Sequence, residues 1–355
     1  MPRRATTVVV SGGLLLGLVL VAALLPVPYV VYGPGPLTDV LGKGQDGPII
    51  QVDGAPSYPT DGSLGLTTVS VTSASARMDL VTAMQAWIDP DKAVVPRDIV
   101  YPGNPTSEEA RQQNAAVFSS SQELASVDAL RYLGYDVPLE ADQVVVREVL
   151  EGGAADGVLE SGDLILEVDG DPVLTPTDVV DAVSSREPGE AVEMTVLRGD
   201  QTLELQVSTS ESEVDPDRAA IGVVVAPAWE LPVDVTIDVP GQIGGSSAGL
   251  VFALGIVDTL TPGQLLQGAA VAGTGEIDPD GTVGAISGVQ QKIAAARNDG
   301  TAIFLAPAEN CGAVRDAEPA DMLVVPVESL SGAVDVLSDF AAGNTDRLPT
   351  CSSPA

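Results

Sequence analysis

Two residues in the last third of the chain have types and surroundings suited to nucleophilic catalysis. The first, Ser247, lies in the run Gly-Ser-Ser-Ala-Gly at 245–249. A strand-like alternating segment at 234–239 precedes it and an apolar, helix-like segment follows. Small neighbours let a substrate approach the backbone, and a helix N-terminus offers unpaired N–H groups to an oxyanion. Ser247 is therefore a candidate nucleophile and the backbone of Ser246 a candidate oxyanion donor, whereas a serine that only caps the helix is the alternative.

The second residue, Lys292, is a candidate base. Residues 289–297 read as a helix in which Lys292 shares an apolar face with Ile293 and Ala296, while the neighbouring Gln291 is expected to face solvent. Burial disfavours the ammonium form, and a neutral lysine can take the proton of a serine hydroxyl. Lysine occurs only at positions 43, 92 and 292 of this chain. The alternative is a lysine whose stem covers apolar surface while its ammonium reaches solvent.

Composition excludes several competing chemistries. The 355 residues contain no histidine, which removes Ser-His-Asp and Cys-His mechanisms and histidine-ligated zinc. A formal charge of −34 argues against binding nucleic acid. No metal or cofactor is expected, and the sequence has no Gly-x-x-x-x-Gly-Lys-Ser/Thr motif for binding nucleotide phosphates.

Two cysteines, Cys311 and Cys351, lie near the C-terminus. Their spacing is not that of a metal cluster or a redox pair. In an oxidising compartment they are expected to form one disulfide, and two independent thiols are the alternative.

The N-terminus has the pattern of a membrane anchor. Arg3 and Arg4 precede an apolar run from position 8 to 25 that continues to Tyr29 and Tyr32, long enough for the ~20 residues that a spanning helix needs. The basic residues at the start and Tyr29 and Tyr32 at the far end indicate that residues 1–7 are cytoplasmic. We therefore predict a single-pass anchor at 8–32 in the cell membrane, with the remaining chain extracytoplasmic. A cleaved signal peptide is the alternative.

The middle of the chain predicts structural elements without a catalytic constellation. In the extracytoplasmic N-terminal region, 33–127, residues 63–71 read as a strand. Thr106 and Glu109 have the spacing of a capping box that opens a helix ending at Gly134. From 144 to 207, short apolar segments separated by Gly, Asp and Pro predict a compact β-rich module.

This module resembles a bacterial PDZ domain over residues 128–210. The resemblance rests on Gly-Gly-Ala-Ala at 152–155 and on the run from 157 to 173, which contains Gly-Asp-Leu-Ile-Leu-Glu-Val-Asp-Gly. It implies binding of an extended peptide as an added strand on a sheet edge. The nearest candidate for the loop that grips the peptide carboxylate is Leu133, Gly134 and Tyr135, and a helix C-cap is the alternative for the same residues.

Residues 220–340 resemble the proteolytic domain of the Lon protease family, which implies an α/β (α+β) fold. Three segments carry the resemblance in the family's order: 245–249, then Gly-Thr-Gly-Glu-Ile at 273–277, then 281–292. The resemblance implies that the serine directly before Ala-Gly, Ser247, is the nucleophile and that Lys292 is the base. It also places Thr274 near the pair as a possible partner of the lysine, and a threonine that satisfies a turn is the alternative.

Two residues depart from the Lon pattern. Ser246 stands where proline is common in the family, and Ser287 replaces the first glycine of a pair. Neither departure removes a catalytic group.

Together the segments resemble bacterial membrane-anchored, PDZ-containing Lon-like serine proteases of Gram-positive type, followed here by a tail at 341–355. The resemblance implies an ATP-independent endopeptidase that cleaves extracytoplasmic peptides or proteins presented by the PDZ domain, and a homo-oligomer. Two other hypotheses are a catalytically inactive peptide-binding scaffold and a protease that mainly processes itself.

Overall fold

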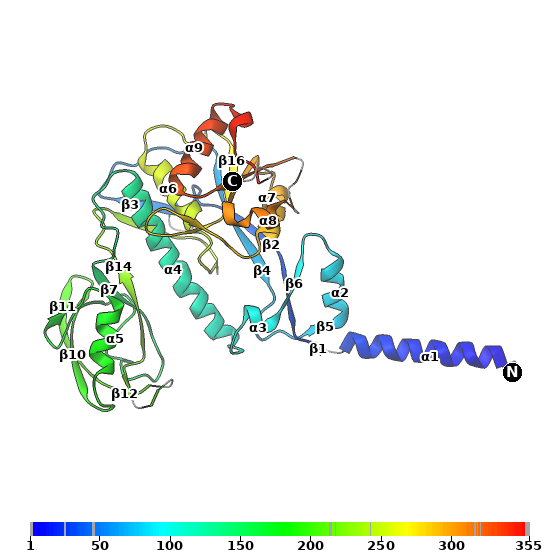
Figure 1. Ribbon diagram of the computed structural model, residues 1–355, viewed down its shortest axis with the longest axis horizontal. Coiled ribbons are helices and arrows are strands. Elements are labelled where there is room, and N and C mark those ends of the chain that lie inside the picture. The colour runs from blue at the N-terminus through cyan, green and yellow to red at the C-terminus, as the bar shows by residue number, and fades with distance from the viewer. Residues whose placement is uncertain are drawn as a thin grey trace. The chain divides into compact units, whose positions relative to one another are not determined.

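The computed structural model describes residues 3–24, 26–44, 47–212, 215–216, 218–241, 243–315, 317, 319 and 321–351, and it divides into two compact units. Unit 1 comprises residues 1–51, 56–125 and 236–355, and unit 2 comprises residues 52–55 and 126–235. The chain thus enters unit 2 from unit 1 and later returns (Figure 1). The predicted N-terminal segment 1–7 and tail 341–355 extend into residues 1–2 and 352–355, which lie outside the described residues.

A six-stranded sheet forms the centre of unit 1. Its order is β20 (Leu323–Val327), β19 (Ile303–Pro307), β16 (Ala270–Gly273), β4 (Ser63–Val71), β2 (Tyr29–Asp39) and β6 (Ala93–Pro96). The first four strands run parallel, and β2 runs antiparallel to both of its neighbours. Strand β19 is buried along its whole length, as expected for a parallel strand covered on both faces.

Helices cover this sheet. They include α6 (Gly249–Leu260), α7 (Val289–Asn298) and α9 (Leu330–Ala341). Successive residues of a strand face opposite sides. On β16, Ala272 packs in one core cluster with Ile293 of α7, while a side chain at Gly273 would meet Val251 of α6. Helices α6 and α7 therefore lie on opposite faces of the sheet, as Figure 1 shows.

A long helix, α4 (Ser107–Tyr132), begins at the predicted capping box. The Thr106 N–H donates to Glu109 and the Glu109 N–H donates back to Thr106 Oγ1, at 2.7 and 3.2 Å, which confirms that prediction.

The boundaries between the units fall within α4, within β3 (Ile50–Asp53), within β15 (Asp234–Ile237) and after residue 55. The other elements of unit 1 are α1 (Arg3–Leu24), β1 (Pro26–Val27), β5 (Met78–Asp79), α2 (Leu80–Ile88), α3 (Arg97–Val100), β17 (Glu276–Ile277), β18 (Val283–Gly284), η1 (Ala308–Asn310), α8 (Cys311–Val314) and η2 (Thr345–Arg347).

The predicted transmembrane anchor at 8–32 is wrong. Helix α1 contains residues 8–24 of the apolar run, but no helix in the described part of the chain is long and apolar enough to cross a membrane. Pro26 cannot continue a helical hydrogen-bond ladder, and the chain changes to strands there. Tyr29 and Tyr32, interpreted as the aromatic end of the anchor, pair instead with β6 in the sheet.

Unit 2 is a β-rich module that contains α5 (Pro176–Ser184) and the C-terminal end of α4, and its apolar side chains form a core cluster of their own. Its main sheet has the order β11 (Gln201–Ser208), β10 (Ala191–Arg198), β8 (Leu164–Val168), β7 (Gln143–Val149) and β14 (Val223–Ala228). The short strands are β9 (Asp171–Pro172), β12 (Ser210–Glu211) and β13 (Ala219–Ala220). Strand β14 lies beyond the predicted PDZ segment, 128–210, in the sequence. It nevertheless pairs with β7 and forms the outermost strand of this sheet.

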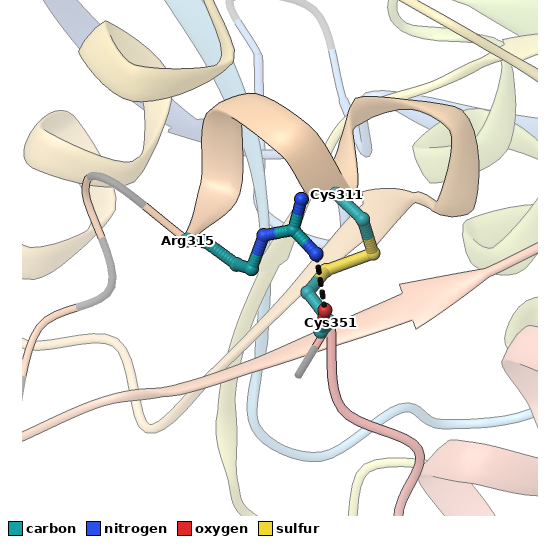
Figure 2. Close-up of a disulfide and its surroundings, with 3 residues drawn as sticks. All are labelled: Cys311, Arg315 and Cys351. Atoms are coloured by element: carbon teal, nitrogen blue, oxygen red, sulfur yellow. Dashed lines mark hydrogen bonds between the residues drawn. A yellow bond between two sulfur atoms is a disulfide. The ribbon is translucent and has the colours of Figure 1, made fainter. Parts of the chain in front are cut away.

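Cys311 and Cys351 form a disulfide in unit 1 (Figure 2). It ties the start of α8 to the C-terminal end of the described chain, where Cys351 is buried in the cluster that contains α7. Arg315 of the same region donates a hydrogen bond to the carbonyl of Cys351 at 3.4 Å.

Replacing both cysteines with serine is expected to destabilise unit 1 by about 2–4 kcal/mol, because the bridge closes a loop of 40 residues and restricts the unfolded chain. Urea unfolding of the wild type and the double variant measures the difference. Reduction of the wild type should lower its stability by a similar amount. Equal midpoints for the oxidised wild type and the variant would contradict the expectation.

Candidate active site

Ser247 lies at the start of α6, as the sequence predicts. The glycine-rich loop ends at Ala248, which caps the helix, and α6 begins at Gly249. Gly245 has a φ of +95°, which favours glycine and lets the loop turn into the helix. Among the described residues, no acceptor in the chain is bonded to the N–H of Ser246 or Ser247.

Lys292 reaches the same point from α7. It is 2% exposed, and its Nζ lies 2.5 Å from Ser247 Oγ. Burial lowers the pKa of Lys292 to about 7, against a smaller opposing effect of the negative charge on Glu276. A substantial fraction of the amine is then neutral near pH 7, as a base for serine requires. The neighbouring Gln291 is also buried, at 3% exposed, so the expectation that it faces solvent is wrong.

Thr274 connects the two residues. Lys292 Nζ donates to Thr274 Oγ1 at 2.8 Å, and Thr274 Oγ1 donates to the carbonyl of Ser247 at 3.0 Å. Thr274 is fully buried directly after β16. The threonine therefore bonds the lysine and also satisfies a backbone carbonyl, so both interpretations of this residue hold.

The other loop serine has different partners. Ser246 Oγ donates to the carboxylate of Glu276, and its carbonyl accepts from Ser121 Oγ at 2.9 Å. Its hydroxyl therefore faces an acid and not the lysine, which leaves Ser247 as the serine paired with Lys292.

A cleft of about 840 Å³ opens over these groups. Its lining includes Ser246, Ser247, Glu276 and Lys292, together with residues of the first half of α4. A smaller adjoining cavity of about 200 Å³ also borders Ser247. The apolar side chains that line it are Leu66, Val69, Phe118 and Ile243. The half-buried Ser247 thus borders an open cleft, with the buried Lys292 behind it and an apolar recess beside it.

Unit 2 has a groove of its own, of about 530 Å³, between α5 and the β13–β14 segment. Val179 and Val183 of α5 lie on one side, and Ile221, Gly222 and Val223 on the other. Within the described sheet, β14 is the outermost strand and pairs only with β7. Gly222 has a φ of +72°, so the chain turns there with backbone groups near the mouth of the groove.

The residues predicted to hold a peptide carboxylate do not line this groove. Gly134 has a φ of +85° and ends α4, with its N–H donating to the Arg131 carbonyl and the Tyr135 N–H donating to the Leu130 carbonyl. That pattern is a helix C-cap. Ile221, Gly222 and Val223 line the groove instead.

Comparison with known families agrees with this geometry. The family model "Lon protease (S16) C-terminal proteolytic domain" matches residues 218–337, which contain Ser247, Thr274 and Lys292. The chain carries a Lon-type serine peptidase domain. The family model "PDZ domain" matches residues 131–209, within unit 2. The Lon-type match starts at residue 218, yet β14 belongs to the sheet of unit 2, so the family boundary and the structural boundary differ.

Individual relatives match one part of the chain or the other. The Lon protease of Citrifermentans bemidjiense is 38% identical over 134 residues, 34% of this chain and 16% of that protein. The serine endoprotease DegS of Escherichia coli K12 is 36% identical over 69 residues, 19% of each chain. The chain therefore spans less than a fifth of the length of these curated relatives.

Solved structures are similar over a small part of the chain. The PDZ domain of an SdrC-like protein from Listeria monocytogenes is 26% identical and covers 24% of this chain and 87% of that chain, with a TM-score of 0.22.

Sequence reasoning missed the part of the site supplied by α4. Asn114, Phe118 and Ser121 contact or line the catalytic loop region, but all three lie more than a hundred residues before it. Their spacing of four and three residues places them on one helix face. That periodicity is visible in the sequence, although nothing in it indicates which surface the face contacts.

Proposed function

We propose that this protein is a peptidase that hydrolyses peptide bonds of extracytoplasmic peptides or proteins with Ser247 as nucleophile and Lys292 as base, without ATP. The observation that carries the proposal is the 2.5 Å approach of Lys292 Nζ to Ser247 Oγ at the base of an open cleft. A buried lysine with a pKa of about 7 has few structural uses that would offset the cost of burying it, and a perturbed group in a cleft favours a catalytic role.

The reaction follows from these contacts. Neutral Lys292 accepts the hydroxyl proton as Ser247 Oγ attacks the peptide carbonyl carbon. The negative oxygen of the tetrahedral intermediate binds the free N–H groups of Ser247 and Ser246. The lysine ammonium then protonates the leaving amine, and an acyl-enzyme remains. A water that gives its proton to Lys292 attacks this ester and releases the acid, which regenerates both groups. Thr274 holds the Lys292 amine toward Ser247 throughout.

Unit 2 is proposed to present the substrate. Its groove offers an unpaired edge of β14 and an apolar wall from α5, which suit an extended peptide that adds as a strand. The proposed extracytoplasmic location is supported by the disulfide, because such bonds persist in oxidising compartments.

Cleavage of fluorescein-labelled casein by the full chain, without added ATP, tests the proposal. The Ser247→Ala variant should show no cleavage above background. Ser246→Ala keeps its backbone N–H and lacks only a hydroxyl that faces Glu276, so it should retain substantial cleavage. If Ser247→Ala cleaves casein as fast as the wild type, the assignment of the nucleophile is wrong.

The same variant separates the two other hypotheses. An inactive scaffold predicts no casein cleavage by the wild type and unchanged peptide binding in Ser247→Ala. A self-processing protease predicts internal cleavage of the wild-type chain that disappears in Ser247→Ala, with little turnover of casein.

A further inference from the structure

The middle of α4 contacts the loop that contains the nucleophile. Asn114, Phe118 and Ser121 lie on one face of the helix. Phe118 packs edge-on against Phe252 of α6, with ring centroids 5.6 Å apart, which holds this face against the core of unit 1. Asn114 and Ser121, on either side of it, bond to the loop backbone.

Ser121 fixes the peptide group that joins Ser246 to Ser247. Its side chain is buried, and its Oγ donates to the Ser246 carbonyl at 2.9 Å. The C=O and N–H of a trans peptide point in opposite directions within one plane. Holding the Ser246 carbonyl toward α4 therefore directs the Ser247 N–H away from Ser121, and this N–H is the proposed oxyanion donor.

Asn114 fixes a second peptide group two residues earlier. Its carbonyl accepts from the Gly245 N–H at 3.0 Å. The contact is close: a Cβ added to Gly244 would lie 2.6 Å from the Asn114 Cβ. The backbone of Gly244 is not in the left-handed region, so what excludes a side chain there is the proximity of α4.

We propose that α4, which lies outside the residues matched by the Lon-type model, is a positioning element of the active site, and that Ser121 orients the Ser247 N–H toward the developing oxyanion. This inference rests on the proposed function. A hydrogen-bond donor stabilises the developing oxyanion most when it is held rigidly toward the oxyanion position before the reaction. The loss of one such donor typically lowers the rate by about 10²–10³-fold. Loss of its support, with the donor still present, should cost less.

The Ser121→Ala variant of the full chain tests this role. With labelled casein, kcat should fall about tenfold while KM stays within about twofold, because the hydrogen bond acts on the transition state. Affinity for a leucine-based peptide boronic acid, whose tetrahedral adduct places an oxygen at the oxyanion position, should fall by a similar factor. The pH midpoint of activity should not move, because Lys292 is untouched. Ser121→Thr, which keeps the hydroxyl, should recover part of the rate.

A control and a second variant make the test decisive. Gln113→Ala changes an exposed side chain of the same helix and should match the wild type. Gly244→Ala forces α4 and the loop apart and should also lower kcat, even if Ser121→Ala proves too unstable to assay. If both Ser121→Ala and Gly244→Ala cleave like the wild type while Ser247→Ala is inactive, the role of α4 is refuted and the proposed function stands. If Ser247→Ala is fully active, the proposed function itself has failed.

Discussion

Replacing Lys292 with methionine should reduce casein cleavage by about 10³-fold or more, because the variant keeps an apolar stem on the buried face of α7 but has no group to accept the Ser247 proton. Lys292→Arg is the matched variant. Its guanidinium keeps the positive charge but does not deprotonate, so it should be equally inactive. Active Lys292→Arg would show that charge, and not proton transfer, is what the site requires.

The pH profile checks the same assignment without a mutation at the lysine. The neutral amine is the active form, so kcat/KM should rise with pH through a midpoint near the pKa of about 7 and level off above it. The negative charge of Glu276 favours the ammonium, so Glu276→Gln should move the midpoint to lower pH. A flat wild-type profile between roughly pH 5 and 9 would count against Lys292 as the base.

The second large effect is expected in unit 2, where Arg198→Met should lower stability by about 3–5 kcal/mol. Asp163 is 1% exposed and accepts two hydrogen bonds from Arg198, both at 2.7 Å. Removing the guanidinium leaves the buried Asp163 carboxylate without its counter-charge. The Val158 carbonyl also loses the hydrogen bond that it accepts from Arg198.

Urea unfolding in a Trp87→Phe background measures this effect, because Trp229 then reports on unit 2 alone. Glu160→Gln, which breaks the exposed pair that Arg198 makes in the same unit, is the control and should change stability by less than about 1 kcal/mol. The double variant Asp163→Asn/Arg198→Met should be more stable than Arg198→Met. If Arg198→Met unfolds at the wild-type midpoint, the buried pair contributes nothing.

Acid should weaken unit 2 through the same pair. Burial by itself raises the pKa of Asp163, but the hydrogen bonds and charge of Arg198 outweigh it and the net pKa is lowered. A depressed carboxyl pKa contributes stability above the pKa of the unfolded state, and this is lost as the pH falls through the folded value. Arg198→Met should therefore flatten the acid limb of the stability profile.

The pairing of Ser247 with Lys292 was predictable from the sequence because its signal is local. The Gly-Ser-Ser-Ala-Gly run, the absence of histidine and one lysine on an apolar helical stripe restrict the chemistry before any fold is known. The structure brings Ser247 and Lys292 to 2.5 Å of each other. The disulfide was predicted on other grounds, from two cysteines without metal or redox spacing in an oxidising compartment, and the structure joins Cys311 to Cys351.

Two expectations were wrong where a local pattern alone was used. An apolar N-terminal run indicated a spanning helix at 8–32, but residues from Tyr29 onward pair in the sheet. Helical spacing assigned Gln291 to solvent, but this residue is buried, at 3% exposed. Leu133–Tyr135 forms the helix C-cap that was the alternative for these residues, and a role in holding a peptide carboxylate stays a prediction.

The sequence by itself therefore determined the candidate catalytic residue types, their order, and two recognisable modules, because each of these is carried by contiguous residues or a fixed helical spacing. Only the tertiary structure decided that β14 completes the sheet of unit 2 and that α4 supports the nucleophile loop. Both depend on pairing between segments distant in sequence. Such pairing depends on backbone hydrogen bonds and shape complementarity, which the residue types alone do not reveal. Nothing in the sequence distinguishes Ser121 from other helix serines, whereas the fold places its Oγ 2.9 Å from the Ser246 carbonyl.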